Sequence, residues 1–331
     1  MTQRERIRKA LESGDSSSYI GVLEQPAIDA VIADLINYKN PLRLNVPRKR
    51  GEGKAWRCHR RSAAANTPTY WITETTNTTG STWIDDSSYE LLEFTYKTLF
   101  AKGRVTRFYQ AIGRSYMDIL AEEIEARAID FKNAEDYAMV AGSSTSTTNA
   151  VSGAMPSGLA ELLDMYDSGS QVIRTEDSSS TGGTSLTLTK LDELIDKCKG
   201  EPDMLIMSKK SRRIVQGLLQ VSQRFVDKVK VNGGFSLMTY AGIPIFVSTN
   251  IGDNEWLKSD NTVGTTTNSS YQSSSIYAVN IDEFFVAELT PVTIKPLAKT
   301  SSQYDDFEIY CDETFVLRDP LTCARLAGVK E

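Results

Sequence analysis

The two residues best suited to chemistry in this 331-residue chain stand side by side: Cys58 and His59, the latter being the only histidine. A thiol next to an imidazole base is the pairing of a nucleophilic enzyme site. The surrounding stretch, KRGEGKAWRCHRRS, is typical of extended chain, in which adjacent side chains point to opposite faces. In that geometry the two side chains cannot align for attack, so we expect no catalytic role for them.

Other candidate ligands and loops also fail to form a known type of site. The cysteines are widely spaced, at positions Cys58, Cys198, Cys311 and Cys323. Without a Cys-x-x-Cys pair, this spacing argues against a disulfide framework and against a zinc site. The pieces TGGTS and VNGGF lack the glycine spacing and the lysine of a phosphate-binding loop. The sequence therefore predicts no catalytic residues, no metal and no cofactor, and hence no enzyme activity.

Charge is distributed unevenly along the chain. The stretch 41–61 holds eight basic residues and one acid, a local balance of +7, whereas the whole chain has −6, so the remainder carries −13. An acidic protein overall is poorly suited to bind duplex DNA, which calls for broad positive surface. A basic arm on an acidic body is instead attracted to another copy of the same body.

Three roles for the basic arm are open: a clasp between subunits, a solvated loop and a nucleic-acid contact. Trp56, Tyr70 and Trp71 interleave with the cations, which suits base stacking and interface anchoring equally. We favour the clasp. The residues expected to make intersubunit contacts are Arg48, Lys49, Arg50, Lys54, Trp56, Arg57, Arg60, Arg61 and Trp71.

Periodicity predicts the elements that carry the arm. An amphipathic helix is expected over Gln25–Tyr38, and the arm continues into a long protruding hairpin. Alternation from Leu92 to Phe100, a turn at Lys102 and Gly103, and the run RVTRFYQ predict a two-stranded ribbon. The longest helix is expected over Ser115–Val140. Its apolar stripe comprises Tyr116, Leu120, Ile124, Ala128 and Phe131.

The rest of the chain alternates helices and strands, which predicts a mixed α and β domain after a break at 142–149. Helices are expected over Leu159–Tyr166 and Lys190–Lys199, with strands at QVIRT and DMLIMS. Ser208 is placed to cap a helix that starts at Lys209. Two extended segments follow in SLMTYAGIPIFVSTNI, then a polar insert over 259–275. In the strand-rich end, Phe307, Ile309 and Cys311 alternate with polar residues, so Cys311 is expected in the core.

This order of parts resembles the major capsid proteins of tailed bacteriophages, whose Hong Kong 97 phage fold is shared with encapsulin shells. The resemblance covers nearly the whole chain from about Gln25. It rests on NPLRLNVPRKR leading into a hairpin, on the long helix ending in EARAIDFKNAEDYAMVAGSS, and on the pair PDMLIMSKKSRR and TYAGIPIFVSTNI. The closing segments YAVNIDEFFVAEL and YDDFEIYCDETFVLRDPLTCARLAGV complete it.

The resemblance implies an α+β capsid fold with four parts. These are an N-terminal arm over 1–45, an extended β-hairpin loop over 46–86, a peripheral domain over 87–144 and 291–331 with the long helix as its spine, and an axial α/β domain over 145–290.

The resemblance also implies function and partners. The chain is expected to self-assemble into hexamers and pentamers of an icosahedral shell around double-stranded phage DNA, in a virion assembled in the host cytoplasm. Portal protein and a possible decoration protein are implied partners. Only about 25 residues precede the helix of the arm, which favours a separate scaffolding protein. No apolar run suits a membrane span. An encapsulin-type compartment and a nucleic-acid-binding protein are the alternatives.

Overall fold

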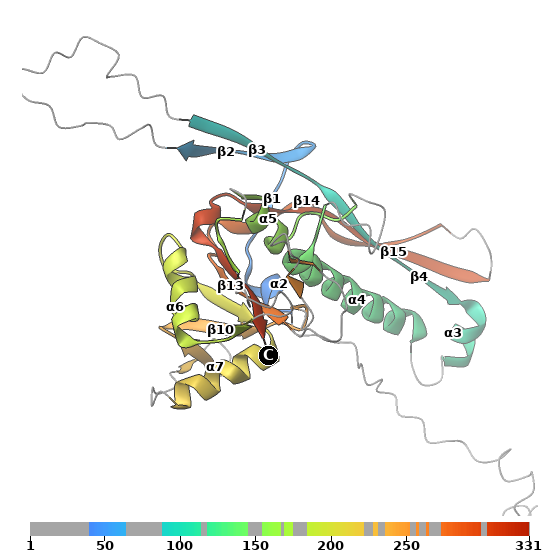
Figure 1. Cartoon of the computed structure of the whole chain (residues 1–331). Helices are drawn as coiled ribbons and strands as arrows, with labels where there is room; N and C mark the ends of the chain where they lie inside the picture. Colours follow the sequence, from blue (N-terminus) through green and yellow to red (C-terminus); the bar gives the residue numbers. More distant parts are fainter. Residues whose placement is uncertain are drawn as a thin grey trace, which may run out of the picture.

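The computed structural model describes residues 40–63, 88–113, 118–144, 154–166, 169–174, 184–221, 228–230, 236–251, 256–257, 263–264, 273–298 and 303–330. Trp71 and the helix expected over Gln25–Tyr38 lie outside these residues. The described segments form a four-stranded sheet and an eight-stranded sheet, each covered by helices, with a hairpin that projects beyond them (Figure 1). This architecture confirms the predicted α+β class.

The first half of the chain supplies most of the elongated part of the molecule. Its elements are α2 (Pro41–Asn45), β1 (Arg48–Arg50), β2 (Ala55–Ala63), β3 (Ser88–Thr95), β4 (Lys97–Thr106), α3 (Arg107–Gly113) and α4 (Ile119–Ala141). Strands β1 and β4 are the edges of the four-stranded sheet, whose order is β1-β14-β15-β4, with β14 (Phe284–Pro296) and β15 (Tyr304–Leu317) between them. Residues far apart in the sequence therefore share one sheet.

Helix α4 is the predicted long helix, beginning four residues later than expected and ending one residue later. Asp118 caps it, because its side chain accepts hydrogen bonds from the backbone N–H groups of Leu120 and Ala121. Of the predicted stripe, Leu120, Ile124, Ala128 and Phe131 pack on Phe307, Ile309 and Cys311 of β15, and Tyr116 lies outside the described residues. Cys311 is fully buried, as predicted. Among the described helices, none is long and apolar enough to cross a membrane.

The two-stranded ribbon predicted around Lys102 and Gly103 is wrong. Strand β3 pairs with β2, and β4 runs straight through Gly103 and pairs with β15. The glycine marks a close approach instead of a turn, since a Cβ there would lie 2.1 Å from the Phe307 ring. The end of the predicted second strand, RFYQ, lies in helix α3.

The second sheet has the order β5-β16-β13-β7-β10-β9-β8, with β6 also paired to β16. Its strands are β5 (Val172–Arg174), β6 (Thr184–Ser185), β7 (Met204–Met207), β8 (Lys228–Lys230), β9 (Ser236–Tyr240), β10 (Ile243–Val247), β13 (Ser273–Val279) and β16 (Ala324–Lys330). Helices α5 (Leu159–Met165), α6 (Leu188–Lys197) and α7 (Lys209–Val221) accompany it. Two short pieces complete the list, the pair β11 (Trp256–Leu257) with β12 (Val263–Gly264) and a 3-10 turn at Pro320–Thr322.

Two local signals in this half are confirmed, and a third needs a correction. Ser208 Oγ accepts a hydrogen bond from the backbone N–H of Ser211 at 3.0 Å, which caps α7. Strands β9 and β10 meet at a tight turn in which Ala241 and Gly242 both have positive φ. The predicted polar insert is too long at its end, because β13 begins at Ser273 and its two following serines are buried.

Strand pairing runs across the expected border near Pro291. Strand β14 continues through that proline, and its pairing with β15 shifts register between Glu288 and Thr290 and again between Thr290 and Thr293. Pro291 lies within the second shift and beyond the segment that β1 covers, so among the described residues its missing N–H interrupts no regular strand pair. At the chain's end, β16 pairs with β13 and β5 in the eight-stranded sheet. The two sheets are thus joined through strands on both sides of the expected border.

Candidate intersubunit interface

The first three predicted contact residues belong to the body of the chain. Strand β1 pairs in parallel with β14, placing Arg48 opposite Val286 and Arg50 opposite Glu288. Before β1, helix α2 buries Leu42 in the main hydrophobic core, and Val46, just after that helix, is buried in the same core. We call residues 40–51 the arm root. It is anchored to the subunit from which it comes, so the protruding part of the hairpin begins after it.

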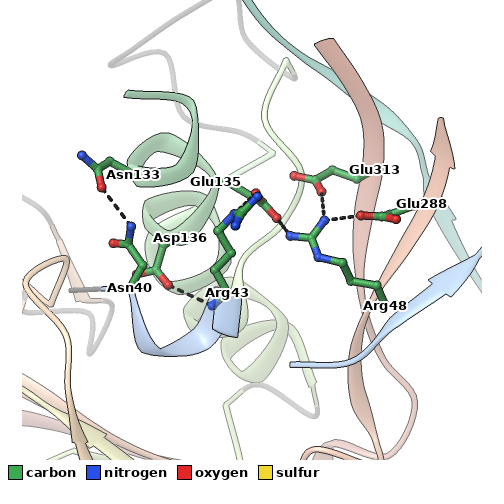
Figure 2. A network of polar contacts seen from close by, with 8 residues as sticks. All are labelled: Asn40, Arg43, Arg48, Asn133, Glu135, Asp136, Glu288 and Glu313. Carbon is green, nitrogen blue, oxygen red and sulfur yellow. Dashed lines mark hydrogen bonds and ion pairs between the residues drawn. The ribbon is translucent and has the colours of Figure 1, made fainter. Parts of the chain in front are cut away.

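Arg48 is the centre of a polar cluster beneath the arm root (Figure 2). Its guanidinium bonds to Glu135 of α4 and to Glu288 of β14, and it lies 3.6 Å from Glu313 of β15. Arg43 of α2 donates to the second oxygen of Glu135 at 2.6 Å. The acids are held deep in the protein, because the side chains of Glu135 and Glu313 are 0% and 3% exposed. Arg48 therefore neutralises carboxylates of its own chain.

Neighbouring polar contacts extend this cluster along α4. Asp136 accepts hydrogen bonds from the backbone N–H of Arg43 at 3.1 Å and from Asn250 at 2.7 Å, while burial raises its pKa. Asn40 donates to Asn133 at 2.9 Å. Each of these bonds joins the arm root, or the loop after β10, to the spine helix. Together they fix the direction in which the chain enters the hairpin.

One face of the β2–β3 hairpin packs on the body. Trp56 meets the Phe285 ring edge-on at 5.4 Å, and Lys49 lies over the same ring at 3.8 Å. Arg60 donates to the backbone carbonyls of Arg318 and Leu317, at 2.8 and 3.2 Å. These three predicted contact residues thus hold the hairpin to its own subunit.

The opposite face of the hairpin is open to solvent. It carries Arg57, His59 and Arg61 on β2, which lie opposite Glu93, Leu91 and Tyr89 on β3. Tyr89 is 71% exposed and Leu91 is 54% exposed. Arg57 bonds to Glu93 at 3.1 Å, and that pair is itself exposed. Lys54, before β2, and Arg50 are also exposed. We call this open face, together with Lys54, the outward hairpin face.

The structure gives Cys58 and His59 the opposed directions expected of strand neighbours. Cys58 is half-buried and lies opposite Leu92, whereas His59 is exposed and lies opposite Leu91. All four cysteines are free thiols. Within the part of the chain that the structure describes, no cluster of side chains is suited to hold a metal ion.

The thiols should differ sharply in reactivity. Burial raises the pKa of Cys198 to about 12 and that of Cys323 to about 11, and it raises the pKa of Cys311 further. We expect Cys58 to be alkylated first in the native chain, with all four thiols reacting after denaturation. Mass spectrometry of iodoacetamide-treated protein measures this order. Early labelling of Cys311 would contradict the buried position of β15.

Sequence reasoning missed the carboxylates of the cluster. A signal for Glu313 was present, because the alternation that places Phe307, Ile309 and Cys311 inward also places residue 313 on that face. Glu135 also had one, because it lies four residues after Phe131 and so continues the apolar stripe of α4. Glu288 had no comparable signal, since its burial depends on where β1 docks, which the local pattern of β14 does not encode.

Comparison with solved structures finds the fold of this chain in capsid and encapsulin proteins. It matches the capsid of an empty GTA particle with a TM-score of 0.67 at 13% identity, covering 95% of this chain and 100% of that one. The capsid of cyanophage A-1(L) matches with a TM-score of 0.67 at 10% identity, covering 94% of this chain and 98% of that one. The SrpI encapsulin of Synechococcus elongatus PCC 7942 matches with a TM-score of 0.63 at 12% identity, covering 94% of each chain.

At these identities the structural matches establish the Hong Kong 97 type of fold, which capsids and encapsulins share. No curated protein is detectably similar in sequence. The sequence does match a protein-family model described as SU10 major capsid protein, over residues 99–330. That span includes the spine helix, both central strands of the four-stranded sheet and all eight strands of the second sheet. The chain therefore belongs to the SU10 major capsid protein family, whose members form a capsid shell.

Proposed function

We propose that the chain assembles into hexamers and pentamers that close into an icosahedral shell around double-stranded phage DNA. The match to the family model carries this proposal, and the projecting hairpin supports it. A closed shell repeats each contact many times, so weak contacts add up to a stable particle. The role is structural, with no catalytic step, and the shell assembles in the host cytoplasm before becoming part of the virion.

The outward hairpin face is the proposed contact with a neighbouring subunit. Tyr89 and Leu91 offer apolar area, and Arg57 and Arg61 flank them with positive charge. Aromatic and arginine side chains are the types that anchor protein interfaces. Of the predicted contact residues, Lys54, Arg57 and Arg61 belong to this proposal, together with Arg50 at the end of β1. Trp71, which lies outside the described residues, stays a predicted contact. Arg48, Lys49, Trp56 and Arg60 serve the subunit itself.

Other parts of the proposal follow the family resemblance. The division into domains stays as the resemblance implies it, with a peripheral domain over 87–144 and 291–331 that contains the spine helix, and an axial domain over 145–290 near the capsomer centre. A separate scaffolding protein, a portal protein and a decoration protein are the proposed partners. The encapsulin alternative shares the fold, but the family model favours a phage capsid. The nucleic-acid alternative loses support because Arg48 and Arg60 are occupied within the chain.

Electron microscopy of the purified chain tests assembly. We expect capsomers or closed shells, with or without a coexpressed scaffolding protein. A protein that stays monomeric at every salt concentration and with that partner would contradict the proposal. Particles that enclose proteins and exclude DNA during infection would favour the encapsulin alternative, whereas discrete soluble oligomers with salt-sensitive DNA binding would favour a nucleic-acid-binding protein.

A further inference from the structure

The cluster under the arm root contains more acid than base. Glu135, Glu288 and Glu313 converge on two guanidinium groups, those of Arg43 and Arg48 (Figure 2). Three carboxylates and two cations leave one negative charge in excess if all are ionised. A buried, uncompensated charge is costly, so such a group takes up a proton where it can.

Glu313 is the acid placed to hold that proton. Its Oε2 atom is buried and accepts no hydrogen bond from the residues that the structure describes. The nearest guanidinium nitrogen of Arg48 is 3.6 Å away, while Arg48 bonds directly to Glu135 and Glu288. Burial, followed by the nearby negative charge of Glu135, raises the pKa of Glu313 to about 8, although Arg48 opposes this shift.

Charged and titratable groups surround Glu313 on every packed element. They are Arg43 of α2, Arg48 and Arg50 of β1, Lys97 of β4, Glu135 and Asp136 of α4, Glu288 of β14 and Cys311 of β15. Lys97 is the strand partner of Glu313, and Arg50 is the strand partner of Glu288. Burial already raises the pKa of the Cys311 thiol above that of Glu313. Cys311 therefore stays protonated across the neutral range, and Glu313 is the group that titrates there.

The arm root is the element whose displacement would let water reach this cluster. Strand β1 has three residues and lies at the sheet edge, with backbone bonds from Val286 to Pro47 and from Gly51 to Glu288 on either side. The other elements around Glu313 are long and embedded, since β14 and β15 pair over most of their lengths and α4 packs on two cores. Short edge segments open at lower free-energy cost than embedded strands.

We propose that this cluster is a proton-dependent latch, closed over a neutral Glu313 and opened by displacement of the arm root with release of that proton. The folded-state pKa of Glu313 is raised above the ordinary value of 4.5. The closed state therefore binds one more proton between pH 4.5 and about 8, and its stability is greatest at the low end of that window and falls as pH rises through it.

Hydrogen–deuterium exchange of the unassembled chain tests the latch independently of shell formation. After correction for intrinsic exchange, the opening constant of a peptide covering residues 45–54 should rise by up to about tenfold per pH unit from pH 6 and level off near pH 8. In Glu313→Gln the side chain keeps its shape and cannot ionise, so this rise should disappear. A peptide covering β7, a strand inside the eight-stranded sheet, serves as the reference.

A second variant keeps the test decisive if Glu313→Gln fails to fold. Glu288→Gln removes a negative charge that contributes to the raised pKa of Glu313, so the levelling-off should move to lower pH. Identical pH profiles for the wild type and Glu313→Gln would overturn the proposal, and so would an unchanged levelling-off in Glu288→Gln. A pH-dependent rise of equal size in the β7 peptide would show global opening and would overturn it as well.

Discussion

Replacing Arg48 with methionine should lower the free energy of unfolding of the unassembled chain by about 3–5 kcal/mol, the usual cost of breaking a buried ion pair from one side. Methionine retains much of the length of the side chain but leaves Glu135 with Arg43 alone and Glu288 without its guanidinium partner. Guanidinium denaturation followed by fluorescence measures the change. An effect of this size would make Arg48 a residue on which the fold of the single subunit depends.

The matched control is Arg57→Met. Arg57 comes from the same basic stretch and also bonds to a glutamate, but its side chain is 63% exposed and Glu93 is 43% exposed. Exposed pairs contribute about 0.2–1 kcal/mol, so this variant should unfold close to the wild type. If both variants lost the same small amount of unfolding free energy, the cluster around Arg48 would not be the anchor that its burial indicates.

Reversing the charge of Lys54, Arg57 and Arg61 together to glutamate should abolish shell formation while leaving the subunit folded. The three side chains are exposed and belong to the outward hairpin face, away from every described core. Each contact is weak and is screened by salt, yet its loss is repeated at every subunit of the shell. Sedimentation measures shell yield, and thermal melting of the unassembled chain measures stability.

A charge-preserving triple variant, with Lys54→Arg, Arg57→Lys and Arg61→Lys, separates charge from overall disturbance. It should assemble at close to the wild-type yield, because the attraction that we propose depends mainly on sign. Normal shells from the glutamate variant would show that the outward hairpin face is not held by its charge. The packaged DNA would then be the next candidate partner for these cations.

Local sequence patterns predicted most of the regular elements near their observed positions. The stripe from Leu120 to Phe131 identified both the spine helix and its buried face, because a 3.6-residue period survives any arrangement of the neighbours. Ser208 marked the start of α7 for a similarly local reason, since a cap bonds only to backbone groups a few residues away. The alternation at Phe307 to Cys311 correctly placed one side of β15 in the core.

The prediction of a two-stranded ribbon was wrong because an alternating pattern indicates a strand but not the strand with which it pairs. Leu92 and the residues after it do alternate, yet β3 pairs backward with β2, and β4 pairs with a strand about 200 residues later. In the sequence, a glycine inside a strand such as Gly103 cannot be told from a glycine in a turn. Only the position of Phe307 across the sheet shows that the glycine makes room for a ring.

The sequence by itself determined that the stretch 41–61 is strongly basic, that it enters a hairpin, and that the chain from about Gln25 onward resembles a capsid protein. Only the tertiary structure decided what each cation does. Arg48 and Arg57 are nine residues apart in one basic run, but docking of β1 on β14 buries the first among three acids, while strand alternation turns the second outward. Charge is a property of composition, whereas its partner and its dielectric surroundings depend on packing between distant segments.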